Sequence, residues 1–397
     1  MDKRIKILFV HHAAGWGGAP ISMIKLINHL DKNKYSPEVL LLKNSIVAQK
    51  LSENNIPYKI ADSVFYKRYY KFFTHIDVSY FKWYKLFRLV KLFMWLLSRY
   101  HYAHKELSKH HFDIVHLNSS ALTDWLAPAH KKAKVVIHIR EPFRKGKYDI
   151  LHHFFRKQMQ LYADKIVAIS KDNAARVDLP EKTNIIYNFS EIPQKTTDTT
   201  SYRSKKVLYL GGSENIKGFF TMVEALDFLD NDVKVLFGGY YSTKLLTGIK
   251  AEKKIKDFLG FERKKRNAIR TIKTHPNAIY VGVIDQVSPY YEKTCCLVSP
   301  FAKSHFARPV IEAYLHKKPA IGTNIKGMSE IIIHKKTGLL VQNENAQELA
   351  QAINKLAAQP DLAQEYGCNA YTMAQERYST KNTQLFENLY HTLIYDN

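Results

Sequence analysis

The stretch RIKILFVHHAAGWGGAPISMIKLINHL, residues 4–30, decides the fold class. Residues 5–10 form the short apolar run of a buried strand, and residues 21–30 carry apolar side chains at helical spacing. A Gly-rich loop that contains Gly17 and Gly18 joins the two segments. This order of strand, Gly-rich turn and helix indicates the first unit of a parallel sheet covered by helices.

The same alternation continues along the chain in two series. Five further apolar runs predict strands at 38–42, 113–117, 134–139, 165–169 and 184–187. A second series predicts helices at 218–229 and 308–316 between strands at 206–210, 233–237, 278–281, 295–299, 319–322 and 338–341. The prediction is an α/β protein with two doubly wound, Rossmann-like domains that face each other across a cleft, where ligands of such folds bind.

A polar, Thr-rich segment separates the two series. Residues 191–204 (EIPQKTTDTTSYRS) have no apolar period and are typical of an interdomain linker. We therefore predict an N-terminal domain at 1–190, a linker at 191–204, a C-terminal domain at 205–378 and a final segment at 379–397 with an amphipathic helix over 380–395. A length of 397 residues suits two domains of ordinary size.

Composition and charge restrict the class of protein. Hydrophobic residues make up 46% and charged residues 24%, which excludes a disordered or fibrous chain. Sixty Lys and Arg against 36 Asp and Glu give a net charge of +24, so that the surface attracts nucleic acid, acidic lipid or phosphorylated substrates. Three cysteines are too few for a disulfide framework or a four-ligand zinc site.

The sequence offers neither a signal peptide nor a spanning helix. Residues 1–10 contain too few apolar residues for a signal-peptide core. The longest hydrophobic region, residues 86–97, is interrupted by Arg88 and Lys91 and is too short to cross a bilayer. We expect a cytoplasmic protein.

A basic, aromatic-rich helical excursion is expected at 65–111 of the first domain. Lys82, Lys85, Arg88 and Lys91 recur every third residue, opposite apolar side chains, which is the composition of a membrane-surface helix. An amphipathic helix packed on its own domain, with solvated Lys and Arg, explains the pattern as well. Nucleic-acid binding has no further support in the chain. A second basic cluster at 244–273 is expected to be a solvated face.

Two Gly-rich turns are candidate phosphate sites. The loop with Gly17 and Gly18 precedes a helix, whose first backbone N–H groups bind anions, although such a turn can also be a plain tight connection. The second domain repeats the arrangement with Gly212, followed by Lys217 and Gly218 at the start of a helix. The lysine could place its ammonium on a diphosphate.

A third cluster lies in SPFAKSHFARPVIEA, residues 299–313. Pro309 suits the first turn of a helix. Glu312 is expected within that first turn, amid apolar neighbours, where a carboxylate needs a partner. Two vicinal ribose hydroxyls could donate to it, or it could be a capping carboxylate near the helix N-terminus.

These motifs carry a resemblance over nearly the whole chain. GGAP (17–20), NIKGF (215–219) and RPVIEAYLHKKPAIGTNIKGMSEIIIHKKTGLLV (308–341) resemble the retaining family 4 glycosyltransferases of the two-domain GT-B fold. The resemblance implies transfer of a sugar from a nucleoside diphosphate sugar to an acceptor hydroxyl, with retention at the anomeric carbon. It also implies that no metal takes part and that the last helix crosses back to the N-terminal domain.

The resemblance implies a role for each matching residue. Gly17, Gly18 and Lys217 would contact the donor diphosphate, Glu312 the ribose, and the backbone after residue 281 the base. The full donor-binding set is Gly17, Gly18, Gly212, Lys217, Gly282, Val283, Ser304, His305, Phe306, Ala307, Arg308 and Glu312. The catalytic candidates are Lys217, Glu312, Arg140 and His138.

Two positions depart from the family pattern, and a third feature differs at the end of the fifth strand. The first glutamate of the Glu-x7-Glu signature falls on Ser304, and the family's diphosphate arginine falls on Gly212. Arg308, Lys303 or Arg140 could replace the missing cation. Where the family has His-Asp against the donor sugar, this chain has Arg140 and Glu141, two residues after His138. His138 could equally be a satisfied strand histidine.

The resemblance also implies partners. We expect a nucleotide sugar as donor, with UDP rather than GDP, no separate cofactor, and a glycan or lipid-linked acceptor in bacterial surface polysaccharide synthesis. The protein would then be peripheral on the anionic inner face of the plasma membrane and would bind no nucleic acid. Because of Ser304 and Gly212, the alternative is a non-catalytic GT-B scaffold or a glycan-binding partner of another transferase.

Overall fold

The chain forms two compact units. The computed structural model describes residues 4–61, 63–69, 92–143, 149–193, 199–241 and 260–396. Unit 1 consists of Met1–Phe189 and Thr380–Asn397, and unit 2 of Ser190–Ser379. Within the expected linker, Thr199–Arg203 forms a 3-10 helix (η4) whose Tyr202 is buried in unit 2 and donates to the Lys317 carbonyl. This part of the segment therefore packs as a piece of unit 2.

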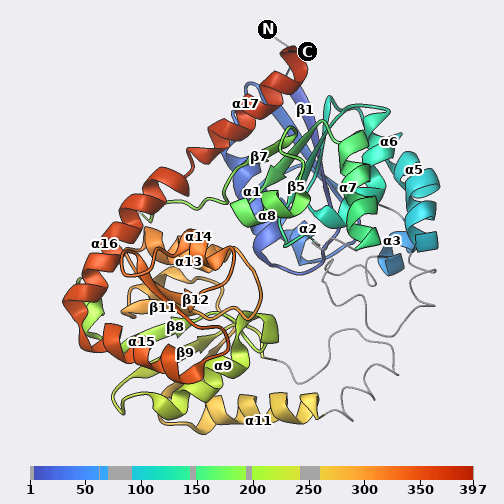
Figure 1. Ribbon diagram of the computed structural model, residues 1–397. Coiled ribbons are helices and arrows are strands. Elements are labelled where there is room, and N and C mark those ends of the chain that lie inside the picture. The colour runs from blue at the N-terminus through green and yellow to red at the C-terminus, as the bar shows by residue number, and fades with distance from the viewer. Residues whose placement is uncertain are drawn as a thin grey trace. The chain divides into compact units, whose positions relative to one another are not determined.

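Unit 1 is built on a seven-stranded parallel sheet of order β3-β2-β1-β4-β5-β6-β7 (Figure 1). Its strands are β1 (Ile5–His11), β2 (Tyr35–Leu41), β3 (Tyr58–Ile60), β4 (Ile114–Leu117), β5 (Lys134–Ile139), β6 (Lys165–Ala168) and β7 (Thr183–Ile185). Its helices are α1 (Gly18–His29), α2 (Ile46–Glu53), α3 (Val64–Tyr69), η2 (Ser98–Tyr102), α5 (Ala103–Leu107), η3 (Ser120–Trp125), α6 (Leu126–His130), α7 (Ile150–Tyr162), α8 (Lys171–Val177) and α17 (Asn382–Tyr395).

Helices cover both faces of this sheet. Successive strand residues point to opposite faces, so that Leu8 and Phe9 of β1 belong to two different apolar clusters. The Leu8 cluster includes side chains of α6 and α7, and the Phe9 cluster includes side chains of α1, α2 and α17. The C-terminal helix α17 contributes Phe386 and Tyr390, so that the end of the chain packs on the unit that holds its beginning.

Unit 2 is built on a six-stranded parallel sheet of order β10-β9-β8-β11-β12-β13. Its strands are β8 (Lys206–Tyr209), β9 (Lys234–Gly238), β10 (Ala278–Gly282), β11 (Cys296–Ser299), β12 (Ala320–Thr323) and β13 (Gly338–Val341). Its helices, besides η4, are η5 (Asn215–Lys217), α9 (Phe219–Glu224), η6 (Ala225–Phe228), α11 (Phe261–Thr274), α12 (Ser288–Tyr291), α13 (Arg308–Leu315), α14 (Met328–Ile331), α15 (Ala346–Ala358) and α16 (Pro360–Arg377).

Most predicted elements are present, and the differences have simple causes. Strand β3 was not predicted, because it is a short edge strand whose side chains are mostly exposed and give no apolar run. The helix predicted over 218–229 is split into α9 and the 3-10 helix η6. The basic excursion lies only in part within the described residues, since 70–91 fall outside them.

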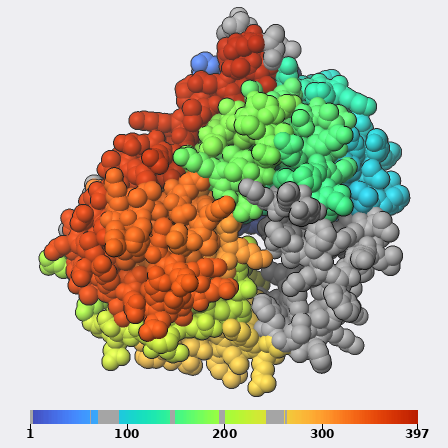
Figure 2. Space-filling model, in the orientation of Figure 1, coloured from blue at the N-terminus to red at the C-terminus, as the bar shows by residue number. Residues whose placement is uncertain are grey.

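The described part of the second basic cluster is a surface helix. Helix α11 reaches the surface of the molecule (Figure 2, yellow). It buries Ala268, Ile269 and Ile272 and exposes cations that include Arg263 and Arg270. Over residues 260–273 the cluster is therefore the solvated face that the sequence predicts. Among the residues that the structure describes, no helix combines the length and the apolar character that crossing a membrane requires.

Candidate functional site

The turn that carries Lys217 is fixed at the switch point of the unit 2 sheet. Strand order reverses between β8 and β11, the place where doubly wound sheets bind ligands. Gly218 has φ +74° and lies so close to the loop after β11 that an added Cβ would be 1.8 Å from the Pro300 carbonyl oxygen. The backbone N–H of Ala302 donates to the Ile216 carbonyl at 3.0 Å. The two loops therefore pack against each other through their backbones.

Lys217 presents its ammonium at this edge. The side chain is 35% exposed, and Nζ lies 3.4 Å from Oε1 of Glu214. The buried Tyr209 hydroxyl lies 3.3 Å from the Lys217 carbonyl and holds the backbone of the turn. Residues 215–217 form the 3-10 turn η5, and the helix itself begins only at Phe219. Because a partly exposed ion pair contributes little, Lys217 is able to exchange Glu214 for another anion.

The backbone at Gly212 explains why the family's arginine is absent from this position. Gly212 has φ +55°, a left-handed conformation that side chains other than glycine disfavour. An added Cβ would lie 2.6 Å from the Tyr240 carbonyl oxygen. No arginine fits there, so a second cation for a diphosphate must come from another position.

Glu312 forms an ion pair with Arg308 along α13. The Arg308 Nη1 to Glu312 Oε1 distance is 3.0 Å, and the two side chains are 18% and 17% exposed. The prediction that Glu312 lies in the first turn is wrong, because α13 begins at Arg308 and no acidic residue stands in its first turn. The N-cap is Ala307, and the cap has no side-chain hydrogen bond. Arg308, and not the helix end, therefore holds the carboxylate.

The loop before α13 contributes backbone more than side chains. Phe306 and Ala307 are buried, so that only their main chain could contact a donor. The His305 ring stacks on Phe301 with centroids 4.3 Å apart, and Ser304 is half-buried. At the end of β10, the Gly282 carbonyl accepts from the N–H of Gly239 at 2.6 Å, and Val283 is 68% exposed.

In unit 1, the loop with Gly17 and Gly18 is open. Both residues are exposed, and apart from the adjoining backbone no atom of the described residues lies within 4 Å of the place where a Cβ would stand on either. Gly17 is the N-cap of α1 and provides no side-chain hydrogen bond to the first N–H groups of that helix. The helix N-terminus therefore keeps backbone N–H groups that could donate hydrogen bonds to an anion.

Arg140 lies at the carboxyl end of β5 with neutral partners. Its Nε donates to Oδ1 of Asn118 at 2.5 Å and its Nη1 to Oδ1 of Asn188 at 3.1 Å. The residue is only 8% exposed, and burial lowers the pKa of Arg140 to about 10, so that the guanidinium stays charged at neutral pH. The neighbouring Glu141 carboxylate accepts from the hydroxyls of Ser119 and Ser120.

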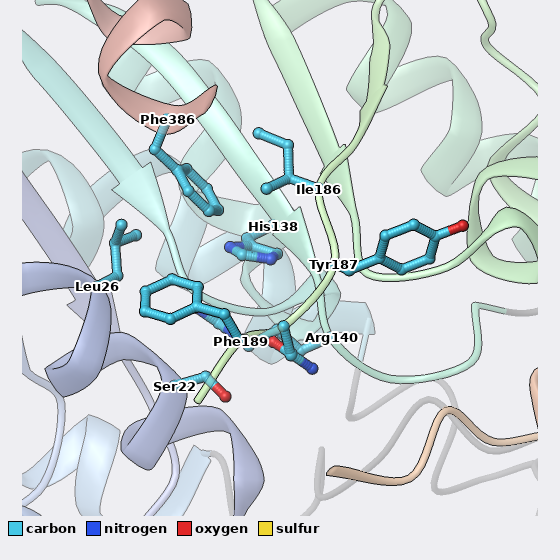
Figure 3. A pocket seen from close by; sticks show the side chains of 9 residues that line it. Ser22, Leu26, His138, Arg140, Ile186, Tyr187, Phe189 and Phe386 are labelled. Carbon is cyan, nitrogen blue, oxygen red and sulfur yellow. Dashed lines mark hydrogen bonds between the residues drawn. The ribbon is translucent and has the colours of Figure 1, made fainter. Parts of the chain in front are cut away.

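His138 is buried in a chain of hydrogen bonds. Its Nδ1 lies 3.2 Å from Nε2 of His116, whose Nδ1 lies 2.7 Å from the Tyr390 hydroxyl of α17. Burial, together with Arg140, holds the pKa of His138 well below the ordinary range. Figure 3 shows His138 beside a cavity of about 10 Å³, which has room for about one water molecule. Since a sugar cannot enter this cavity, the geometry favours the strand histidine.

Sequence reasoning gave no role to His11, Asn118 and Asn188. His11 ends β1, Asn118 follows β4 and Asn188 follows β7, all at the carboxyl edge of the sheet. This edge includes the β1–β4 switch point. A polar residue at the end of a predicted strand or within three residues after it is a signal that could have identified them.

The described carboxylates give no metal site. In the described ranges, no group of three or more His, Cys, Asp or Glu side chains is arranged to hold a metal ion.

Two family models match most of the chain. The model of glycosyltransferase family 4 matches residues 16–190, and the model of glycosyl transferases group 1 matches residues 194–373. With the two doubly wound units, these matches show that the chain belongs to the family 4 glycosyltransferases of the GT-B fold.

Individual relatives are distant. An uncharacterised glycosyltransferase of Methanocaldococcus jannaschii is 25% identical over 228 residues, which is 56% of this chain and 58% of the relative. The capsular polysaccharide biosynthesis glycosyltransferase CapM of Staphylococcus aureus is 23% identical over 121 residues, 30% of this chain and 32% of CapM. The chain thus matches about half the length of these relatives or less.

The fold itself matches a solved structure over nearly its full length. Anabaena HepE in complex with UDP and glucose has a TM-score of 0.72 and 17% identity, over 97% of this chain and 99% of that chain. At this identity the likeness shows the GT-B fold.

Proposed function

We propose that the protein transfers a sugar from a nucleoside diphosphate sugar, with UDP as the nucleotide, to a hydroxyl group of an acceptor glycan. The observation that carries the proposal is Glu312, oriented by Arg308 on the helix that follows β11, within the segment that most resembles the family. The carboxylate would accept from two ribose hydroxyls, and Lys217 would meet the diphosphate. Retention at the anomeric carbon and metal independence are part of the proposal.

Replacing Glu312 with Gln tests the donor site. The change keeps the shape of the side chain and removes the charge, so that binding of free UDP is expected to weaken by about 1.5 to 3 kcal/mol if both charged hydrogen bonds are lost. Isothermal titration calorimetry measures the affinity. Glu365→Gln removes an exposed carboxylate of α16 in the same unit and should leave UDP affinity unchanged. Equal UDP affinity of wild type and Glu312→Gln would leave Glu312 as a structural partner of Arg308 only.

The alternative is a GT-B scaffold without activity. Gly212 and Ser304 favour it, since each stands where the family has a group that contacts the donor. Hydrolysis of a panel of UDP- and GDP-sugars, with and without EDTA, distinguishes the active transferase from the inactive scaffold. Turnover of one sugar that survives EDTA supports the metal-independent transferase, and the anomer released, read by NMR, tests retention. UDP binding without turnover of any sugar or transfer to any acceptor would favour the scaffold.

The acceptor is proposed to be a lipid-linked or polysaccharide glycan of the bacterial surface. CapM, one of the relatives, is named for capsular polysaccharide biosynthesis. Within the described part of the basic excursion at 65–111, Phe93 and Tyr100 are 60% and 69% exposed, as apolar contacts to a membrane surface would be. Trp95, by contrast, is buried and donates to Thr123, so it does not insert.

Binding to anionic vesicles tests the membrane proposal. Co-sedimentation with vesicles that contain phosphatidylglycerol is expected at low salt, because each cation near an anionic surface contributes about 1 kcal/mol. Changing Lys82, Lys85, Arg88 and Lys91 to Glu, all outside the described residues, should release the protein. As a control, Arg263, Lys264, Arg266 and Arg270 of α11 changed to Glu should leave vesicle binding largely intact. A wild type that stays in the supernatant at low salt contradicts the proposal.

A further inference from the structure

The guanidinium of Arg140 is a buried charge without a carboxylate partner among the described residues. In the described part of the chain its hydrogen bonds go to two neutral amides, those of Asn118 and Asn188. The nearest acidic residue in the chain, Glu141, has its carboxylate directed to Ser119 and Ser120. Glu141 attracts the guanidinium through space without a hydrogen bond that joins the two. A buried cation whose hydrogen bonds go only to neutral groups is costly, since protein interiors normally pair such charges.

Its neighbours are donors as well. Because Arg140 can only donate, the Asn118 oxygen faces it, and the Asn118 amide N–H₂ therefore donates to Nδ1 of His11 at 3.1 Å. The proton of the neutral His11 ring is then on Nε2, a buried atom that has no acceptor in the described part of the chain. Burial lowers the pKa of His11 to about 3, so the ring stays neutral.

A chain of histidines lies on the other side of Arg140. The Tyr390 hydroxyl lies 2.7 Å from Nδ1 of His116, and Nε2 of His116 lies 3.2 Å from Nδ1 of His138. Nε2 of His138 is buried without a hydrogen-bond partner among the described residues, beside the cavity that Arg140 also lines (Figure 3). This edge of unit 1 thus offers a fixed cation and, at His11, a buried N–H donor.

We propose that Arg140 binds an anionic group other than the donor diphosphate, a carboxylate or a phosphate on the donor sugar or on the acceptor. The inference rests on the proposed function and names its substrate class. A planar carboxylate or a phosphate supplies the charge and the acceptor oxygens that the guanidinium lacks, and charged hydrogen bonds of this kind are the strong ones. The position agrees with ligand binding at the carboxyl edge of doubly wound sheets.

The two sources of the anion are separated by matched pairs of probes. UDP-glucuronic acid against UDP-glucose tests an anion on the donor sugar, and glycerol 3-phosphate against glycerol tests an anion on the acceptor. Calorimetry on the full chain is expected to show the anionic member of one pair bound at least about tenfold more tightly than its neutral counterpart. Arg140→Gln should reduce that preference to about twofold or less, while Arg140→Lys retains part of it.

Controls keep the outcomes distinct. Arg156→Gln removes the same charge from unit 1, at a residue that pairs with Asp178 on its surface, and should leave every ratio unchanged. The affinity of UDP alone, measured in parallel, tests the proposed function independently of Arg140. If the wild type prefers neither anionic probe, or if Arg140→Gln keeps the wild-type preference, the inference is wrong. A wild type that prefers glycerol 3-phosphate but does not bind UDP would support the anion site and contradict the donor site.

Discussion

Replacing Lys217 with alanine is expected to lower turnover by about two to three orders of magnitude, as is typical when a group that stabilises developing charge is removed. The ammonium meets charge that grows on the diphosphate as it leaves, so that the loss should appear in kcat more than in KM. Folding should be unaffected, because Lys217 contributes only a partly exposed ion pair with Glu214.

The matched control is Lys206→Ala. Lys206 is an exposed cation at the first residue of β8, the strand whose other end leads into the turn with Lys217. The Lys206→Ala variant removes the same charge at the opposite edge of the same sheet and should leave kcat unchanged. Steady-state kinetics at saturating donor, with melting temperatures of both variants, makes the comparison. Wild-type turnover in Lys217→Ala would mean that the lysine is an ordinary surface cation.

The fold could be predicted because its elements depend on local patterns. Runs such as residues 5–10 and 134–139 are apolar on both faces, which only a sheet buried between two helix layers explains. Strand β3 could not be predicted, because an edge strand needs neither a buried face nor an apolar run. The helix predicted over 218–229 is split at Ala225 into α9 and η6. The spacing of apolar residues in the sequence gives no sign of this split.

The candidate site could be predicted only in part, because its partners are distant in sequence. Lys217 and Glu312 follow recognisable turns and could be named as candidates from the sequence, whereas the Arg308–Glu312 ion pair is visible only in the structure. The absence of an arginine at Gly212 was visible, but its cause, the Tyr240 carbonyl, lies on another loop. Likewise, Asn118 and Asn188 meet Arg140 only because β4, β5 and β7 end at one edge.

Acidification is expected to destabilise unit 1 strongly, through three buried histidines. Burial and the nearby Arg140 lower the pKa of His11 to about 3 and hold those of His116 and His138 well below 6.5. Protonating the ring that accepts at the 3.2 Å contact between His116 and His138 would also place two N–H groups against each other. The folded unit therefore keeps all three rings neutral where the unfolded chain has already charged them.

The direction of the pH effect on stability follows from the number of protons that the folded and unfolded states bind. Between about pH 6.5 and the lower folded-state pKa values, the unfolded chain binds more protons than the folded one, so that stability falls as pH falls and is fully present above pH 6.5. From about pH 7.5 to about pH 5, each such histidine removes about 2 kcal/mol from the free energy of unfolding. All three together would remove about 6 kcal/mol, a large part of the stability of an ordinary domain.

Tryptophan fluorescence measures this loss in unit 1 alone, since Trp16, Trp83, Trp95 and Trp125 all belong to that unit. Urea unfolding across this pH range gives the slope of stability against pH. His116→Gln removes one titrating ring and should reduce the slope by about one third, because each ring contributes about one proton. His391→Gln, an exposed residue of α17, should leave the slope unchanged. A wild type with equal stability at both ends of the range would show that the three rings take up protons in the folded unit without cost, contrary to their burial.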